Sequence, residues 1–376
     1  MAAPAEPRSR PGKGRKLLLL AAALLLALVA VEGLYRLFGP ARTPGKGVIY
    51  ASNGQEVPLG EIVAALTRVE QAFSDLNRGL VPPFGKLQAG VKMRMGYQPP
   101  SRWDYFDANG CVAVDTNSLG FRDEEFAVQK APGELRILCL GDSLTYGQGV
   151  RLDLTWPQRL EAQLRRERGG AVEVINAGFA AGPGVNTPDG YDRWVAEHGI
   201  LFAPDVVVVG LCLNDLGPVD MLTYDAVPLQ PVLGGWSRLL DSAVQACRQR
   251  QARLQKRDYA ARIRDKPAAW NGTQRGLLAL RDLLAARNIP LLVAIFPMMC
   301  QLEPELYPCT EVHTMVAEFC GGNGIACIDL LPDFLGRAEQ DLWVHPTDQH
   351  PNHVGHALFA TRIHDHLTAA GWLGER

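Results

Sequence analysis

The chain of 376 residues is long enough to bury a sizeable core and to hold one large or two medium domains. Its composition is that of an ordinary globular protein, with 47% hydrophobic and 21% charged residues. The formal net charge of -2 at pH 7 leaves no excess of positive charge, so we expect no nucleic-acid partner.

The first forty residues have the pattern of an export signal. The basic stretch RSRPGKGRK precedes an unbroken apolar run from Leu17 to Val31. A membrane span needs about 20 residues, and the run reaches that length through Phe38 if Glu32 and Arg36 pair on one helix face. We expect residues 1–39 to form a cytoplasmic basic stub and an uncleaved signal-anchor helix, with the remainder extracytoplasmic, in the periplasm or outside the cell. The alternative is a cleaved signal peptide, although no clear cleavage site follows.

A linker and a small accessory region follow the anchor. The sequence GPARTPGKG is rich in Pro and Gly, as linkers are. Apolar residues at helical spacing predict a helix from Ile62 to Leu80, and short strands and loops come after it. We therefore assign residues 40–130 to a linker and N-terminal accessory region, and residues 131–376 to the main domain.

From Glu134 onward, two kinds of segment alternate. Apolar runs typical of buried parallel strands are RILCLG, VEVINAG, DVVVVGLCL, IPLLVAIFP and IACIDLL. Between them lie the helical patterns WPQRLEAQLRRE, TPDGYDRWVAEHG and TQRGLLALRDLLAARN. This alternation predicts an α/β fold with a five-stranded parallel sheet and helices on both of its faces.

Residues suited to catalysis lie where these strands end. Ser143 comes directly after the first strand, Asn214 after the third, and His350 after the last, in a Pro-flanked turn. A serine becomes a nucleophile when a base takes its proton and donors hold the oxyanion. His350 is suited to be the base, Asp348 to orient it, and Asn214 to donate to the oxyanion. Taken singly, each has an ordinary explanation as a helix cap or turn residue; their joint placement favours catalysis.

The same segments resemble a known family. GDSLTYGQG, GLCLNDL and DQHPNHVGH look like the first, third and fifth sequence blocks of the SGNH (GDSL) hydrolases, and VDTNSLGFRDEEF resembles the lead-in of exported, membrane-anchored bacterial members. The resemblance covers about two-thirds of the chain, from Glu134 onward. It implies a flavodoxin-like three-layer α/β/α fold and serine ester hydrolysis or acyl transfer. It also implies that Ser143 is the nucleophile and an oxyanion donor, Asn214 a further donor, and His350 the base.

Two positions depart from the family pattern. The usual last block has Asp three residues before His, where this chain has Thr347, so the orienting role passes to Asp348. The second block is longer than usual, and its ending PGVNT resembles the common Pro-Gly-Tyr-Asn-Thr ending, which points to Gly184 as the oxyanion glycine. Gly178, Gly182 and Ala181 stay open as alternatives, because the donor is a backbone N–H.

The remaining chemistry-bearing residues suggest supporting roles. We expect Asp142 to hold the turn around Ser143 through hydrogen bonds to the backbone. His353 and His356 are three residues apart on an expected helix, but no acid-rich set accompanies them or His345, so we expect no metal. We expect no cofactor. Cysteines 300, 309, 320 and 327 lie close together without CxxC spacing, which disfavours zinc and leaves a disulfide open in an oxidising compartment.

These observations lead to one functional hypothesis and two rivals. We expect a serine esterase that hydrolyses carboxylic esters, either O-acyl and acetyl esters or lipid esters, and is attached to the membrane by its N-terminal helix. Its substrate would be an ester-bearing small molecule, glycan or lipid. The first rival is an O-acyltransferase acting on a cell-envelope glycan, which would use the same residues. The second is a catalytically inactive binding or assembly protein on the same scaffold.

Overall fold

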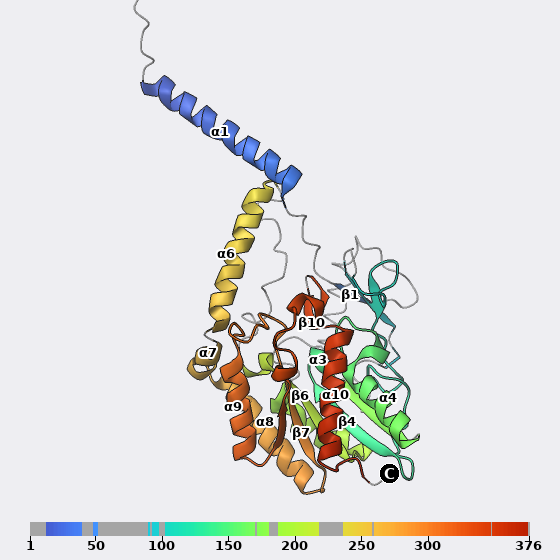
Figure 1. Cartoon of the computed structure of the whole chain (residues 1–376). Helices are drawn as coiled ribbons and strands as arrows, with labels where there is room; N and C mark the ends of the chain where they lie inside the picture. Colours follow the sequence, from blue (N-terminus) through green and yellow to red (C-terminus); the bar gives the residue numbers. More distant parts are fainter. Residues whose placement is uncertain are drawn as a thin grey trace, which may run out of the picture. The chain divides into compact units, whose positions relative to one another are not determined.

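The computed structural model describes residues 13–39, 48–51, 89–90, 92–97, 102–169, 171–179, 187–217, 236–257, 259–346 and 348–374 (Figure 1). The helix expected at 62–80 lies outside these residues. The chain divides into two compact units, residues 1–43 with 229–248 and residues 44–228 with 249–376. Each unit is described by itself.

The smaller unit contains the long helix α1 (Lys13–Phe38) and the start of α6 (Arg238–Arg257). Within α1, Gly14–Phe38 is long and apolar enough to cross a membrane, and its leucines are exposed. The expected pair is present, with Arg36 Nε 2.7 Å from Glu32 Oε1. The Glu32 carboxylate also accepts from the backbone N–H groups of Arg238, at 2.8 Å, and Leu239, at 3.1 Å. Glu32 therefore caps the first turn of α6.

A five-stranded parallel sheet forms the centre of the larger unit and confirms the predicted fold class. Its strand order is β5-β4-β6-β7-β8, which is the flavodoxin-like order 2-1-3-4-5. Each predicted apolar run supplies one strand. The strands are β4 (Leu135–Gly141), β5 (Val172–Gly178), β6 (Val206–Cys212), β7 (Leu291–Phe296) and β8 (Ala326–Asp329). Strands β4, β6 and β7 are buried along their whole length, because helices cover both sheet faces.

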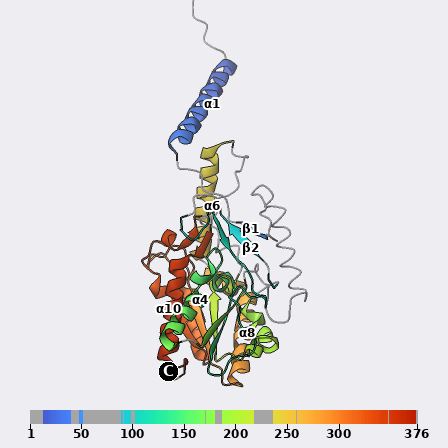
Figure 2. The same ribbon diagram turned by 90° about the vertical axis from the view of Figure 1, so that its right-hand side faces the viewer.

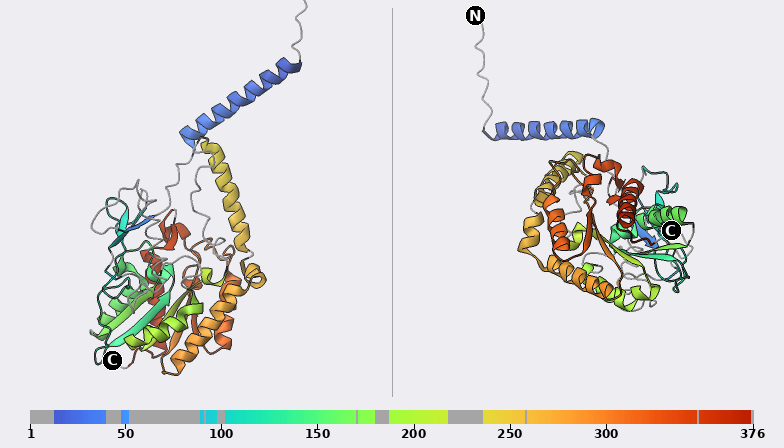
Figure 3. Two further views of the ribbon diagram at one scale, coloured as in Figure 1. Left: turned by 180° about the vertical axis from the view of Figure 1, so that it is seen from behind. Right: turned by 60° about the horizontal axis from the view of Figure 1, so that its bottom comes forward.

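Helices pack in pairs on the two faces of this sheet (Figures 2 and 3). On one face α4 packs against α10, and on the other α5 packs against α8. Asn352 caps the first turn of α10, since its Oδ1 accepts from Val354 N at 2.8 Å. The helices are α4 (Trp156–Arg168), α5 (Tyr191–Glu197), α7 (Tyr259–Asp265), α8 (Ala268–Ala285), α9 (Thr310–Gly322) and α10 (His353–Ala369).

The accessory segment belongs to the same compact unit as the sheet. Its strands β1 (Val48–Ala51), β2 (Met93–Gly96) and β3 (Cys111–Ala113) form a small antiparallel sheet. Further along the segment, the Arg122 guanidinium is fully buried and donates to the carbonyl oxygens of Tyr146, at 2.6 Å, and Gly147, at 2.5 Å. A buried cation bonded in this way fixes the segment to the loop that follows the first sheet strand.

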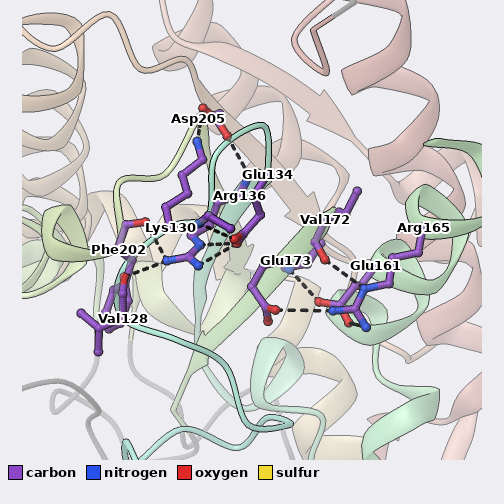
Figure 4. Close-up of polar contacts among 12 residues, drawn as sticks. Val128, Lys130, Glu134, Arg136, Glu161, Arg165, Val172, Glu173, Phe202 and Asp205 are labelled. Carbon is purple, nitrogen blue, oxygen red and sulfur yellow. Dashed lines mark hydrogen bonds and ion pairs between the residues drawn. The ribbon is translucent and has the colours of Figure 1, made fainter. Parts of the chain in front are cut away.

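The amino edge of the parallel sheet carries a network of buried charge (Figure 4). The Arg136 side chain is 1% exposed, and its Nη2 lies 2.6 Å from Glu134 Oε1. Its other donors reach the carbonyl oxygens of Val128, at 2.9 Å, and Phe202, at 3.1 Å. Asp205 accepts from the backbone N–H of Arg136 at 2.7 Å. The network ties the start of β4 to the segments on both sides of it.

Candidate active site

Ser143 is presented by a sharp turn at the end of β4. Gly141 has a φ of +156°, and a Cβ there would lie 2.8 Å from the carbonyl oxygen of Gly210, so only glycine fits. The chain then enters the short helix α3 (Ser143–Tyr146), whose cap is Asp142. The carboxylate of Asp142 accepts from the backbone N–H of Leu144 at 2.9 Å. Ser143 thus begins a helix and Asp142 holds the turn, as expected from the sequence.

His350 and Asp348 lie on a two-stranded hairpin before α10. The sequence predicts a turn around His350, whereas the structure has the strand β10 (Asp348–Pro351) paired antiparallel with β9 (Trp343–His345). The sequence DQHP has no apolar alternation that would predict a strand, and its pairing with the adjacent β9 makes it one. His350 follows Asp348 by two residues, so on this strand both side chains lie on one face. His350 Nδ1 is 2.5 Å from Asp348 Oδ1, and His350 Nε2 is 2.9 Å from Ser143 Oγ. The structure therefore brings Ser143, His350 and Asp348 into one hydrogen-bonded chain.

The surroundings of Asp348 favour the ionised form of its carboxyl group. Burial alone would raise the pKa of its carboxyl, but the charge of His350 opposes this effect. Hydrogen bonds from His350 and from the Tyr97 hydroxyl add to that opposition, and the pKa lies below its ordinary value. An ionised carboxylate next to Nδ1 keeps the proton of a neutral imidazole on Nδ1 and leaves Nε2 free to accept the serine proton.

Asn214 lies beside Asp142, in a 3-10 turn (Leu213–Leu216) at the end of β6. It donates a side-chain hydrogen bond to the Asp142 carboxylate, which together with the Leu144 N–H partly offsets the rise in pKa that burial causes there. Asn214 Oδ1 and Asp215 Oδ2 are buried with no hydrogen-bond partner among the residues that the structure describes. The pKa of Asp215 is raised well above its ordinary value by burial and by the negative charge of Asp142. At this end of the sheet, two buried polar atoms thus have no partner within the described residues.

The expected oxyanion glycine, Gly184, lies outside the described residues, as do the alternatives Gly182 and Ala181. Of the alternatives, Gly178 lies at the end of β5, and its N–H donates to Asn176 Oδ1 at 3.0 Å. A Cβ on Gly178 would be 2.3 Å from the backbone nitrogen of Tyr146, so this glycine lets β5 approach α3 closely.

Tyr97 also contacts this group of residues, and no motif in the sequence pointed to it. It follows β2, and its hydroxyl donates to Asp348 Oδ2 at 2.6 Å. A single tyrosine 251 positions before its partner carries no spacing signal. Tertiary packing alone brings the two together.

The other histidines have local partners. His356 is fully buried, its Nδ1 accepts from Trp156 N at 3.1 Å, and burial lowers its pKa well below the ordinary value. His353 packs edge-on against the rings of Trp103 and Tyr105. His345 stacks on Tyr97, with ring centroids 5.1 Å apart. Within the described part of the chain, no group of three or more His, Cys, Asp or Glu side chains has metal-binding geometry.

All eight cysteines lie in the described residues, and the structure joins none of them in a disulfide. The disulfide left open for the cluster at 300–327 is therefore not formed in this structure. Within the cluster, the Cys320 and Cys327 thiols hydrogen-bond to each other, which lowers the pKa of Cys320 and raises that of Cys327. Cys139 and Cys212 are buried in strands, as their apolar surroundings in the sequence predict.

A family model described as the GDSL-like lipase/acylhydrolase family matches residues 139–358, which is more than half of the chain. The matched range includes Ser143, Asn214, Asp348 and His350. No curated protein matches the chain in sequence.

Solved structures with a similar fold share little sequence with this chain. The psychrotrophic esterase EstA from a Pseudoalteromonas species is 16% identical, over 63% of this chain and 98% of that one, with a TM-score of 0.38. Axe2, an acetylxylan esterase from Geobacillus stearothermophilus, is 16% identical, over 66% of this chain and 100% of that one, with a TM-score of 0.40. A GDSL-like lipase from Bacteroides thetaiotaomicron is 13% identical, over 64% and 92% of the two chains, with a TM-score of 0.36.

Proposed function

The chain belongs to the GDSL-like lipase/acylhydrolase family of ester-bond hydrolases, and we propose that it is a serine esterase with Ser143 as its nucleophile. The observation that carries the proposal is the unbroken chain from Ser143 Oγ to His350 Nε2, at 2.9 Å, and from His350 Nδ1 to Asp348 Oδ1, at 2.5 Å. These are the separations at which a base can take a serine proton while a carboxylate orients it.

Acylation follows from this geometry. His350 Nε2 accepts the Ser143 proton as Oγ attacks the ester carbonyl carbon, and the carbonyl oxygen gains negative charge. Asp348 stabilises the imidazolium that forms. His350 then gives the proton to the leaving alcohol, and an acyl-serine remains. In the second half, His350 activates a water that attacks the acyl carbon, and the free acid leaves as Ser143 regains its proton.

Three donors are proposed for the oxyanion. The backbone N–H of Ser143 lies at the start of α3, and the Asn214 amide lies on the neighbouring strand end. One amide hydrogen of Asn214 goes to Asp142, and the second is available to a developing oxyanion. The Gly184 N–H is the third proposed donor, on the sequence pattern alone. The substrate class that fits is a carboxylic ester on a small molecule. A measurement of activity against acyl length would distinguish O-acyl, acetyl and lipid esters.

A fluorophosphonate probe tests the nucleophile. We expect it to label the wild-type protein and Ser118→Ala, a control that removes an exposed hydroxyl bonded to Glu125, but not Ser143→Ala. Ser143→Ala should also lower kcat on short nitrophenyl esters by roughly 10⁴-fold or more, with an unchanged unfolding midpoint. A series of acyl lengths would define the ester class, and product masses would separate hydrolysis from transfer. A folded wild-type protein that is neither labelled nor active would refute the proposal.

We also propose where the segments of the chain lie relative to the membrane. Residues 1–39 are proposed as stub and signal anchor, 40–130 as linker and accessory region, and 131–376 as the hydrolase domain facing away from the cytoplasm. The apolar helix Gly14–Phe38 and the basic residues before it support this orientation. Cys247 is the exposed thiol in α6, so a membrane-impermeant maleimide should label it in intact cells and should not label Cys247→Ser. Labelling only after lysis would place the domain in the cytoplasm.

A further inference from the structure

The catalytic carboxylate has a second partner besides His350. Asp348 Oδ1 takes both the His350 ring, at 2.5 Å, and the His350 backbone N–H, at 3.1 Å, while Oδ2 accepts from the Tyr97 hydroxyl at 2.6 Å. We propose that Tyr97 is a positioning residue: its hydroxyl fixes the Asp348 carboxylate, so that the imidazole of His350 stays aligned with Ser143. The inference rests on the proposed function, because it assigns Tyr97 to that same site.

The position of the Tyr97 hydroxyl is set by packing on several sides. Tyr97 is 3% exposed, and its ring stacks on His345 and meets Phe106 edge-on, with centroids 5.1 and 5.5 Å apart. A Cβ on Gly149 would lie 2.5 Å from the Tyr97 oxygen, and Gly149 has a φ of +75°. A glycine is therefore needed where the chain passes the hydroxyl. A ring held in this way can fix the group to which it donates.

The protonation states of the two groups suit a hydrogen bond in which the Tyr97 hydroxyl donates and the Asp348 carboxylate accepts. Burial raises the pKa of the Tyr97 hydroxyl well above its ordinary value, and the charge of Asp348 raises it further. Of the other groups that face Tyr97, Tyr105 also raises this pKa and Arg122 lowers it. Tyr97 thus keeps its proton throughout the working range of an esterase, and Asp348 keeps its charge.

The short spacing between Asp348 and His350 explains why such a clamp is useful. Two residues on one strand face are joined by few bonds, but the carboxylate can still rotate about its own side-chain torsions. A hydrogen-bond donor on Oδ2 restricts this rotation. It also gives that oxygen a partner in a side chain that is only 12% exposed. Without the donor, Oδ2 would be buried and short of a partner, and the carboxylate would hold His350 less firmly.

The origin of Tyr97 extends the inference to the accessory region. The residue directly follows β2, within residues 40–130, whereas Ser143, Asp348 and His350 all come from residues 131–376. The accessory segment therefore supplies part of the site's support rather than only a connection to the anchor. Arg122, from the same segment, donates to the carbonyl oxygens of Tyr146 and Gly147 next to the nucleophile helix.

Tyr97→Phe, with Tyr105→Phe as its control, tests the proposal in the full-length protein. Tyr105 is also buried in this cluster, but its hydroxyl has no hydrogen-bond partner. We expect Tyr97→Phe to lower kcat on a nitrophenyl acetate by about 10- to 100-fold with little change in KM, and Tyr105→Phe to stay within about twofold of wild type. In Tyr97→Phe the acid limb of the kcat profile should also move to higher pH. Without the tyrosine hydroxyl, the whole negative charge of Asp348 acts on the His350 ring and favours its protonated form. Equal kcat and pH profiles for the two variants would overturn the proposal.

A double-mutant cycle separates positioning from general destabilisation. In an Asp348→Asn background, Tyr97→Phe should change the residual kcat by less than about twofold, because the acceptor that the hydroxyl fixes is already altered. The same fold-loss in both backgrounds would mean that Tyr97 acts through the fold and not through Asp348.

A spectroscopic readout keeps this result distinct from failure of the proposed function. The proton on His350 Nδ1 should give a far-downfield NMR resonance that is absent in His350→Gln. We expect the resonance to move in Tyr97→Phe and to stay in place in Tyr105→Phe, whether or not an ester is turned over. An unmoved resonance would refute the positioning role, whereas an unlabelled Ser143 together with a moved resonance would refute only the esterase.

Discussion

The two edges of the parallel sheet both bury charge, but they satisfy it differently. At the amino edge, Arg136 meets the carboxylate of Glu134 and two carbonyl oxygens, so its donors have partners (Figure 4). At the carboxyl edge, Asn214 Oδ1 and Asp215 Oδ2 are buried without partners. A buried polar atom without a partner costs stability, and native proteins tolerate such atoms where they serve another purpose. The comparison indicates that the buried charge of Arg136 at the amino edge is satisfied within the fold, whereas the carboxyl edge keeps polar atoms without a partner among the described residues.

Removing charge from the amino edge should produce the largest loss of stability. Arg136→Met would take the cation from Glu134, whose side chain is 12% exposed, and the donor from the carbonyl oxygens of Val128 and Phe202, so we expect the free energy of unfolding to fall by about 3–5 kcal/mol. The kcat of the folded fraction should not change. Urea unfolding gives the first quantity, and titration with the fluorophosphonate probe gives the active fraction.

Arg151→Met is the matched control for that variant. Arg151 pairs with Asp153 at the same two-residue separation, but both side chains are more than half exposed, at 53% and 58%. Exposed pairs contribute about 0–1 kcal/mol, so this variant should be nearly as stable as wild type. Equal losses for the two variants would show that burial does not distinguish the amino edge.

Asn214→Ala should have the opposite profile at the carboxyl edge. We expect kcat to fall by about 10²- to 10³-fold, because a proposed oxyanion donor is lost, while the free energy of unfolding changes little. The variant loses the hydrogen bond to the Asp142 carboxylate, but it also removes a buried oxygen that lacks a partner, and the two effects on stability oppose each other. Steady-state kinetics and thermal unfolding measure the two effects.

Asn323→Ala serves as a control for that variant. Its amide donates to the carbonyl of Phe319 at the end of α9, so the substitution alters stability and not kcat. If Asn214→Ala lowered stability by several kcal/mol and left kcat intact, the carboxyl edge would be structural like the amino edge.

The smallest expected effect is a pH dependence at the amino edge. Burial and the neighbouring charge of Glu161 raise the pKa of Glu173 from 4.5 to about 7 in the folded protein. Between these values the folded state binds more protons than the unfolded state, so stability falls as the pH rises through this window. Glu173→Gln should flatten this fall and add on the order of 1 kcal/mol above pH 7, with little effect below pH 4.5. A steeper fall in urea midpoint from pH 4.5 to 8 in the variant would contradict this assignment.

The sequence allowed the fold to be predicted because its signals are local. Each apolar run from Glu134 onward gives one strand of the parallel sheet. Right-handed crossovers leave few topologies, and the flavodoxin-like order among them is the one that the family resemblance implies. The segment proposed to carry the nucleophile could be singled out for the same reason, since Gly141, Asp142 and Ser143 are adjacent in the chain. The sequence predicted a turn around His350, where the structure has the strand β10, because the residues DQHP have no apolar alternation and end in a proline.

By itself, then, the sequence determined the class of fold, the apolar N-terminal helix and the segments that carry Ser143, Asn214, Asp348 and His350. These follow from periodicity and from residues adjacent in the chain, which need no folding to be seen. Only the tertiary structure decided that Ser143 Oγ and His350 Nε2 lie 2.9 Å apart. It alone also decided that Tyr97, 251 positions from Asp348, donates a hydrogen bond to the Asp348 carboxylate. Contacts of this kind depend on how separate elements pack, and no local pattern in the chain encodes them.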